Sequence, residues 1–397
     1  MSDKIRFYLE KSVAELEDLD RKGLFTKPEL STIMKKRTDF EHRINSRTCK
    51  VNDFIKYAEY EMNVEKLRRK RVKRLGKKTG PKITGVSDYA GPKRVLFIYD
   101  RGTRRFSGDI SLWLLYIEFA KQEKAIHVVT KIFTTLLQLH PTKPQVWILA
   151  AKYEMEDNAS MKTARSIMQR GLRFNSDQSV MWLEYIKLEL IYVSKILARR
   201  RLLGLQTETE LELAGGNDPH VEISDELTTA DVIKADLGSL PEADMSMLGN
   251  IQNNPALRGD VALVIFDAAM DNLNTREKKF SFSLQVLQLI DQFDAVDQQH
   301  LASHVIGYIQ NSDLRESSPK SILLAVTLPI RYVSHDDPTF PDLVKMLLVD
   351  YNNSKQKKVL GPLLTDYIEE KFLQPKLEPE LDDNLRQALE MLKKKFV

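Results

Sequence analysis

The only three tryptophans of the chain recur at a nearly constant interval, and this spacing is the strongest constraint on its fold. Trp113, Trp147 and Trp182 lie 34 and 35 residues apart. An isoleucine followed by an aromatic residue or methionine recurs at the same two intervals, at Ile98, Ile132 and Ile167. Two unrelated markers with one period are typical of a chain built from repeated helix pairs.

Each tryptophan begins a pattern that places aromatic residues and a glutamate on one side of a helix, because offsets of 0, +3 and +7 share one helix face. An earlier copy begins with phenylalanine instead of tryptophan. The members of the four copies are Phe54, Tyr57 and Glu61; Trp113 and Tyr116; Trp147 and Glu154; and Trp182, Tyr185 and Glu189. Arginines follow the first and third isoleucine markers, at Arg101 and Arg170.

The period predicts an all-α fold, an α-solenoid of stacked helix pairs. A single pair cannot bury its apolar face, whereas stacked neighbours build a continuous core. Gly (16) and Pro (15) are scarce in the 397 residues, below the roughly 12% of ordinary proteins, which argues against a turn-rich β fold. The fourth copy lacks the second-helix marker, so its second half is predicted to continue as one long helix.

The sequence divides into four expected segments. These are a helical amino-terminal segment at 1–47, the repeats at 48–205, an acidic linker at 206–254 and a helical region at 255–397. The last segment has amphipathic patterns without a visible period. A degenerate continuation of the solenoid and a separate helical bundle therefore both remain open.

The first repeat contains an insertion of about 25 residues near 66–90, and this insertion carries the densest basic cluster. Between Lys66 and Lys82 ten bases occur without an acid: Lys66, Arg68, Arg69, Lys70, Arg71, Lys73, Arg74, Lys77, Lys78 and Lys82. The net charge of the whole chain is only +4, so any contact with nucleic acid must come from a local cluster. RNA phosphate contact, nuclear localisation and a merely solvated helix face are the three interpretations.

No enzyme motif accompanies these features. The phosphate-binding glycine motifs, the serine-hydrolase motif and the zinc-protease motif are all missing. The repeated glutamates recur on successive helices and cannot converge on one pocket, so each is expected to bond an arginine of a neighbouring helix or an indole N–H. His300 and His304 have a spacing that suits a metal, but no third ligand is apparent. Cys49 is the only cysteine, and no catalytic residue, metal or cofactor is expected.

The aromatic residues, the glutamate and the arginine at this period resemble HAT (half-a-tetratricopeptide) repeats of RNA-processing complexes. Ala120 and Thr135 depart from the pattern in the second repeat. The run KGLFTKPELSTIMKKRTDFEHRINSR, Lys22 to Arg47, is similar to the HAT-repeat subunit of the UTP-B complex, the U3 small nucleolar RNA-associated protein six family, in its fungal members. This similarity covers roughly residues 1–267.

The resemblance implies a non-enzymatic scaffold in the small-subunit processome, a large ribonucleoprotein assembly that supports processing towards 18S rRNA. The implied partners are WD40-propeller proteins of the UTP-B complex, the U3 snoRNA particle and pre-rRNA, and the implied location is the nucleus and nucleolus. No signal peptide or membrane span is apparent, so no membrane partner is expected. Two alternatives remain: a direct RNA-binding protein acting through the basic insertion, and a HAT scaffold of splicing or mRNA 3′-end processing.

Overall fold

The computed structural model describes residues 2–76, 85–202, 254–312, 319–333, 340–353, 357–369, 371, 389–391 and 393. Every regular element in these residues is a helix, which confirms the all-α class. None of the described helices is both long and apolar enough to span a bilayer. The chain divides into two compact units, Met1–Pro141 and Thr142–Val397. This division differs from the four segments expected from sequence, which stay predictions.

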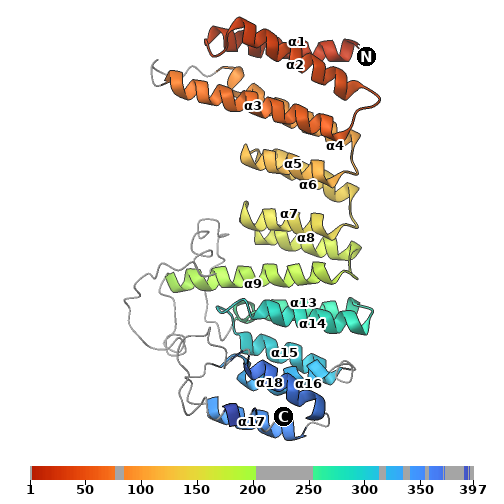
Figure 1. Ribbon diagram of the computed structural model, residues 1–397, viewed down its shortest axis with the longest axis vertical. Coiled ribbons are helices and arrows are strands. Elements are labelled where there is room, and N and C mark those ends of the chain that lie inside the picture. The colour runs from red at the N-terminus through yellow and green to blue at the C-terminus, as the bar shows by residue number, and fades with distance from the viewer. Residues whose placement is uncertain are drawn as a thin grey trace. The chain divides into compact units, whose positions relative to one another are not determined.

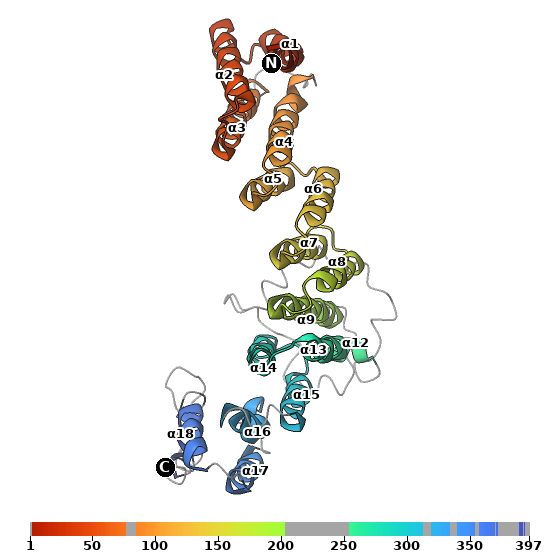
Figure 2. The ribbon, with the colours of Figure 1, turned by 90° about the vertical axis from the view of Figure 1, so that its right-hand side faces the viewer.

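The amino-terminal unit, Met1–Pro141, is a stack of helices in chain order. Its helices are α1 (Ser2–Arg21), α2 (Lys27–Asn45), α3 (Val51–Gly76), α4 (Ser87–Arg105), α5 (Ile110–Gln122) and α6 (Ile126–Leu139). Each helix packs against the next, and α1 also packs against α4. Figure 2 shows α1 and α4 along one side of this group and α2 and α3 along the other.

Helix α2 begins where the sequence carries strong start signals. The backbone N–H of Thr26 donates to the Glu29 carboxylate at 2.8 Å, which forms a capping box, and Pro28 occupies the first turn, where its missing N–H costs nothing. The start of α2 fixes the loop that leads from α1.

The period of the sequence reappears in the helix ends. The second helices end at Phe106, His140 and Asn175, where each backbone N–H donates to the carbonyl four residues earlier. The indole N–H of Trp113 donates to the backbone carbonyl of Ser107 at 3.0 Å, and that of Trp182 donates to Ser176 at 2.8 Å. These bonds fasten the start of a first helix to the loop before it.

The repeated aromatic residues are core residues. All seven are at most 6% exposed: Phe54, Tyr57, Trp113, Tyr116, Trp147, Trp182 and Tyr185. Neighbouring repeats meet through these rings, as Tyr99 of α4 stacks on Tyr116 of α5 with 5.8 Å between ring centroids. The aromatic positions therefore stabilise the stacking of successive helix pairs.

Four charged residues, one from each of the first four helices, meet in the interior. Arg37 of α2 donates from Nε and Nη2 to the two carboxylate oxygens of Glu61 of α3, at 2.8 and 2.9 Å. Its Nη2 also donates to Glu15 of α1 at 3.4 Å, and Arg94 of α4 bonds both Glu15 and Glu61. Arg37 is 1% exposed. Two positive and two negative charges thus neutralise each other in the interior, away from water. We call these four residues the four-helix charge network.

The expectation for the repeated glutamates is right for two of them and wrong for the third. Glu61 bonds Arg37, and Glu189 accepts two bonds of 2.7 Å from Arg165. Glu154 instead accepts from the amide of Asn158 and the hydroxyl of Thr163, at 3.1 and 3.2 Å. The residue 24 positions before Glu154 is Thr130, whereas Glu61 and Glu189 each have an arginine at that separation. Side chains of the following loop and helix satisfy Glu154 instead.

The two arginine markers of the second helices differ in environment. Arg101 donates two hydrogen bonds to Glu41 of α2, at 2.9 and 2.7 Å, and its guanidinium lies over the rings of Tyr8 and Phe97. Arg170 is exposed. Only Arg101 therefore fastens helices together in the way that the repeat pattern suggested.

The carboxy-terminal unit, Thr142–Val397, is a second stack. Its helices are α7 (Pro144–Glu156), α8 (Met161–Phe174), α9 (Ser179–Leu202), α12 (Pro255–Arg258), α13 (Asp260–Asn272), α14 (Arg276–Ile290), α15 (Gln298–Asn311), α16 (Pro319–Arg331), α17 (Phe340–Asn353) and α18 (Lys357–Ile368). Helix α9 is one continuous helix, as predicted. The expected linker at 206–254 lies outside the described residues, apart from Asn254.

The helices that follow this gap pack directly on the repeats of the same unit. Helices α12, α13 and α14 contact α9, α15 contacts α13 and α14, and α16 contacts α15. Figure 1 shows α9 beside α13 and α14. Helix stacking in chain order is the arrangement of a continuing solenoid.

Candidate binding surfaces

The basic cluster begins on the carboxy-terminal part of α3. Helix α3 runs from the first repeat helix to Gly76 without a break, because residues 51–75 contain no proline or glycine and are rich in helix-favouring Lys, Arg, Leu and Glu. Seven of the ten bases therefore lie on one described helix. The remaining three, Lys77, Lys78 and Lys82, lie outside the described residues.

Two arginines of the cluster form ion pairs with the fold: Arg68 is buried, whereas Arg69 is exposed. Arg68, 7% exposed, donates to the Glu65 carboxylate from Nε and Nη2, both at 2.8 Å, and to Asp88 of α4 from Nη1 at 2.7 Å. Arg69 donates to Glu65 at 2.7 Å and to Glu123, just after α5, at 2.6 Å. Hydrogen bonding to Glu65 raises the pKa of Arg68. These pairs fasten α3 to α4 and to the end of α5.

A third arginine, Arg71, fastens α3 to the start of α2. Its Nη1 and Nη2 donate to the two oxygens of Glu29 at 2.9 and 2.7 Å, and Nη1 also donates to the Leu24 carbonyl at 2.8 Å. Its guanidinium lies 4.5 Å from the ring centroid of Phe25. Hydrogen bonding by Arg71 lowers the pKa of Glu29 to about 2. Arg71 is therefore part of the helix packing.

The other four described bases, Lys66, Lys70, Lys73 and Arg74, are exposed. None of them forms an ion pair with a described carboxylate, in contrast to the three arginines. They lie on one side of α3, because residues three or four apart share a helix face. Glu65 and Arg68 face α4, and Lys70 is rotated about 200° from Arg68. The four bases therefore point away from α4, and we call them the outer basic face.

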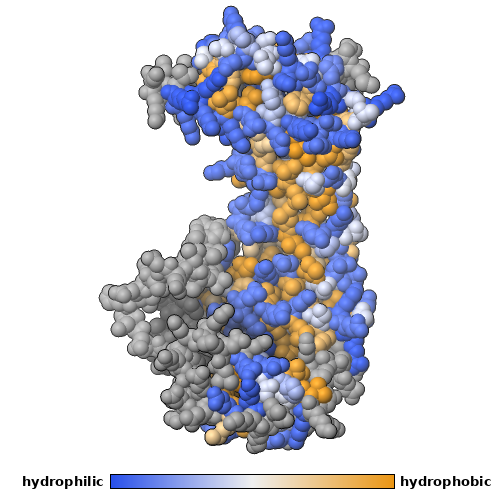
Figure 3. All heavy atoms as spheres, viewed as in Figure 1, coloured by the Kyte–Doolittle hydropathy of each residue, from blue (hydrophilic) through white to orange (hydrophobic). Residues whose placement is uncertain are grey.

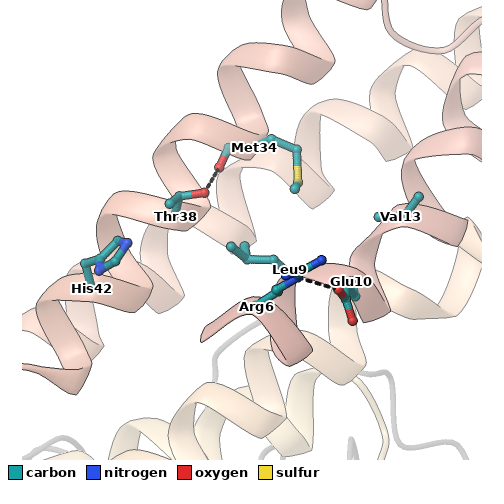
Figure 4. A pocket seen from close by; sticks show the side chains of 7 residues that line it. All are labelled: Arg6, Leu9, Glu10, Val13, Met34, Thr38 and His42. Carbon is teal, nitrogen blue, oxygen red and sulfur yellow. Dashed lines mark hydrogen bonds and ion pairs between the residues drawn. The ribbon is translucent and has the colours of Figure 1, made fainter. Parts of the chain in front are cut away.

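Hydrophilic side chains cover most of the visible surface over α1 to α4 (Figure 3). An apolar groove of about 340 Å³ interrupts this surface between α1 and α2. Figure 4 shows the seven residues that line it: Arg6, Leu9, Glu10, Val13, Met34, Thr38 and His42. Arg6 and Glu10 are paired at 3.0 Å across the rim. The groove is open and mixes apolar walls with both signs of charge.

The histidine pair and the cysteine have structural partners. His300 bonds Asp260 at 2.8 Å, and His304 bonds Asp267 at 2.9 Å, so both imidazoles connect α15 to α13. No group of three metal-ligating side chains occurs within the described ranges. Cys49 is buried, and burial raises the pKa of its thiol. None of these residues forms a reactive site with its neighbours.

Comparison with known proteins matches two consecutive parts of the chain to protein families. Residues 9–94 match the family described as U3 small nucleolar RNA-associated protein 6, and residues 98–200 match the family described as suppressor of forked protein. The chain is 38% identical over 293 residues to U3 small nucleolar RNA-associated protein 6 of Schizosaccharomyces pombe, which is 73% of this chain. The chain belongs to the U3 small nucleolar RNA-associated protein 6 family.

Other members of the family match a smaller share of the chain. A mouse homolog is 37% identical over 199 residues, or 49% of this chain and 32% of that protein, and a Dictyostelium discoideum homolog is 24% identical over 269 residues, or 68% and 42%. The matched part of the S. pombe protein is 57% of its length, so the chain spans little more than half of that relative. The family match at 9–94 contains the outer basic face and the four-helix charge network.

Sequence reasoning missed the charge network, although the sequence carries a signal for it. Arg37 precedes Glu61 by 24 residues, and Arg165 precedes Glu189 by the same 24 residues. In both cases an arginine of a second helix reaches the glutamate at +7 of the next first helix. Helix α2 therefore occupies the position of a second repeat helix, although it lacks the isoleucine marker.

Proposed function

We propose that this chain is a non-enzymatic scaffold subunit of the small-subunit processome, within the UTP-B complex, that supports assembly on pre-rRNA and processing towards 18S rRNA. One observation carries the proposal. The family match at 9–94 coincides with α1, α2, α3 and the first part of α4, whose interior the four-helix charge network joins. The part of the chain that the family model matches is therefore a packed group of helices, which supports a structural role.

The expected partners are WD40-propeller proteins of the UTP-B complex, together with the U3 snoRNA particle and pre-rRNA. The proposed location is the nucleolus, within the nucleus. The names of the relatives associate those proteins with U3 small nucleolar RNA, which supports a place in the same ribonucleoprotein assembly. The chain spans only part of its relatives, so the activity of the whole protein is included in this proposal.

The proposal needs no chemistry from the repeated acids. Glu61, Glu154 and Glu189 lie on three different first helices, α3, α7 and α9, and bond different partners. A scaffold role in splicing or mRNA 3′-end processing is the alternative that the general resemblance to HAT repeats leaves open. The match at 9–94 favours the U3-associated role over this alternative.

Purification of the tagged chain from its own cells, with and without ribonuclease, tests the proposal. We expect propeller-containing proteins to stay bound after ribonuclease treatment and U3 RNA to be lost. The variant Arg37→Met breaks the charge network and should reduce recovery of the same proteins. Recovery of splicing or polyadenylation factors in place of the propeller proteins would show that the proposed assembly is wrong.

A further inference from the structure

We propose that the outer basic face of α3, formed by Lys66, Lys70, Lys73 and Arg74, binds the phosphate backbone of RNA. The inference rests on the proposed role in a ribonucleoprotein assembly and names the surface that would touch RNA directly. It also removes Arg68, Arg69 and Arg71 from the binding cluster that the sequence suggested, because these arginines are engaged in the fold.

Helix α3 carries positive charges that are available to a ligand. Arg68, Arg69 and Arg71 each bond one or two carboxylates at 2.6–2.9 Å, so their charges are paired within the unit, although Arg69 itself is exposed. Each member of the outer basic face is exposed and has no described carboxylate in ion-pair distance. Within the described residues, this face of α3 therefore carries four positive charges that no carboxylate pairs.

The spacing of the four bases suits a row of phosphates. From Lys66 to Arg74 the helix rises about 12 Å, at about 1.5 Å per residue, and the four side chains follow one side of it. A row of this length matches a few consecutive phosphates of one nucleic-acid strand. Lysine ammonium groups on flexible stems act as hydrated point charges rather than as rigid bidentate donors. Such a row contacts a backbone without reading bases.

The residue types of the outer basic face favour RNA over a protein partner. The cores of protein interfaces are enriched in aromatic residues and Met and depleted of Lys, whereas this face has three lysines and no aromatic residue. Tyr89 is 63% exposed, but it lies on α4, on the opposite side of α3 from Lys70. This ring therefore does not lie beside the face to stack on a base. A phosphate backbone fits these properties better than a protein surface does.

The test measures RNA binding by the full-length chain as a function of salt, with a polyuridine strand and a short RNA duplex as probes. The variant Lys66→Gln, Lys70→Gln, Lys73→Gln, Arg74→Gln removes the face. Each lost phosphate contact flattens the slope of log affinity against log salt by about 0.7–0.9, so the slope should fall by about 3. Affinity at moderate salt should fall at least about tenfold for both probes.

A charge-matched control separates the face from net charge. The variant Lys27→Gln, Lys35→Gln, Lys36→Gln, Arg43→Gln removes the same number of exposed bases from α2, where Asp39 and Glu41 lie among them, and it should keep the natural slope. An equal loss in both variants, or an unchanged slope in the α3 variant, overturns the inference. Polyglutamate serves as a third probe. If the α3 variant loses more affinity for polyglutamate than for RNA, the inference is overturned, because the face then prefers an acidic protein.

The proposed scaffold function is tested separately in the same material. If the α3 variant still recovers the propeller proteins while losing RNA affinity, the inference holds beside the scaffold role. If the α3 variant keeps RNA affinity and also recovers these proteins, only the inference fails. Equal melting temperatures of the variant and the natural chain exclude unfolding as the cause of any loss.

Discussion

Replacement of Arg37 by methionine tests whether the four-helix charge network stabilises the amino-terminal unit. Methionine retains much of the apolar stem of arginine, so the change removes mainly the guanidinium. Arg37 bonds Glu61 and Glu15, and both glutamates then share only Arg94. One negative charge is left uncompensated in the interior.

The expected cost follows from that imbalance. Breaking a buried ion pair by removing one partner typically costs 3–5 kcal/mol, and Arg37 and Glu61 are each 1% exposed. We therefore expect Arg37→Met to lower the free energy of unfolding by about 3–5 kcal/mol. The double variant Arg37→Met, Glu61→Gln leaves the balanced pair of Glu15 and Arg94. It should be more stable than the sum of the two single changes predicts, by about 1–3 kcal/mol.

Urea unfolding followed by circular dichroism measures these changes, and hydrogen exchange assigns them to α1–α4. Arg43→Met is the matched control, because this arginine is on the same helix and is exposed; its effect should stay within about 0.5 kcal/mol. Equal urea midpoints for Arg37→Met and the natural chain at neutral pH would refute the assignment of the network to stability.

The pH dependence gives a second readout with a definite sign. Burial raises the pKa of Glu15, but the charges of Arg37 and Arg94 outweigh burial and hold this pKa below its ordinary value of 4.5. In the natural chain, Glu15 therefore contributes stability that is present above 4.5 and is lost as the pH falls. Without Arg37, only Arg94 opposes the effect of burial, so the folded pKa of Glu15 should be less depressed than in the natural chain. The Arg37→Met variant should then lose less stability than the natural chain as the pH falls below 4.5, so the difference in stability between the two should become smaller.

Three further changes test the repeat core. Trp147→Ala should cost about 3–5 kcal/mol, and an unchanged melting temperature would contradict its core position. Arg165→Met leaves buried Glu189 without its arginine and should lower the free energy of unfolding by about 2 kcal/mol or more. Arg170→Met, at an exposed position, should change it by no more than about 0.5 kcal/mol in urea unfolding. Gly171→Ala forces a Cβ against a methionine and an indole ring and should destabilise by about 1–3 kcal/mol. Gly108→Ala meets open space and should instead be neutral or stabilising by up to about 1 kcal/mol in the same assay.

The helical repeats could be predicted because their signal is periodic and local. A buried aromatic at each first helix fixes the rotation of that helix, and the ring type repeats with the structure. The contacts of an arginine, in contrast, do not repeat with the period. Arg101 finds Glu41 on α2 and Tyr8 on α1, whereas Arg170 occupies the equivalent sequence position and is exposed. The period predicts where a residue type recurs, but tertiary contacts decide whether it has a partner.

The division of the basic cluster could not be predicted from a count of charges. The run lacks acids internally, yet its arginines bond carboxylates 20, 42 and 54 residues away, in Asp88, Glu29 and Glu123. Only Glu65, at the start of the run, was near enough in sequence to indicate a pair. Long-range packing thus decides which bases stay available to a ligand.

The residue types on the two sides of α3 support the same division independently of the contacts. The three bases that pair with described carboxylates, Arg68, Arg69 and Arg71, are all arginines, and three of the four bases of the outer basic face are lysines. A planar guanidinium pairs with carboxylates through two parallel bonds and is less strongly hydrated than an ammonium group, so arginine suits buried pairs. An ammonium group keeps its hydration and its freedom at a surface. One basic helix can therefore fasten its neighbours through its arginines while its lysines remain available to a polyanion.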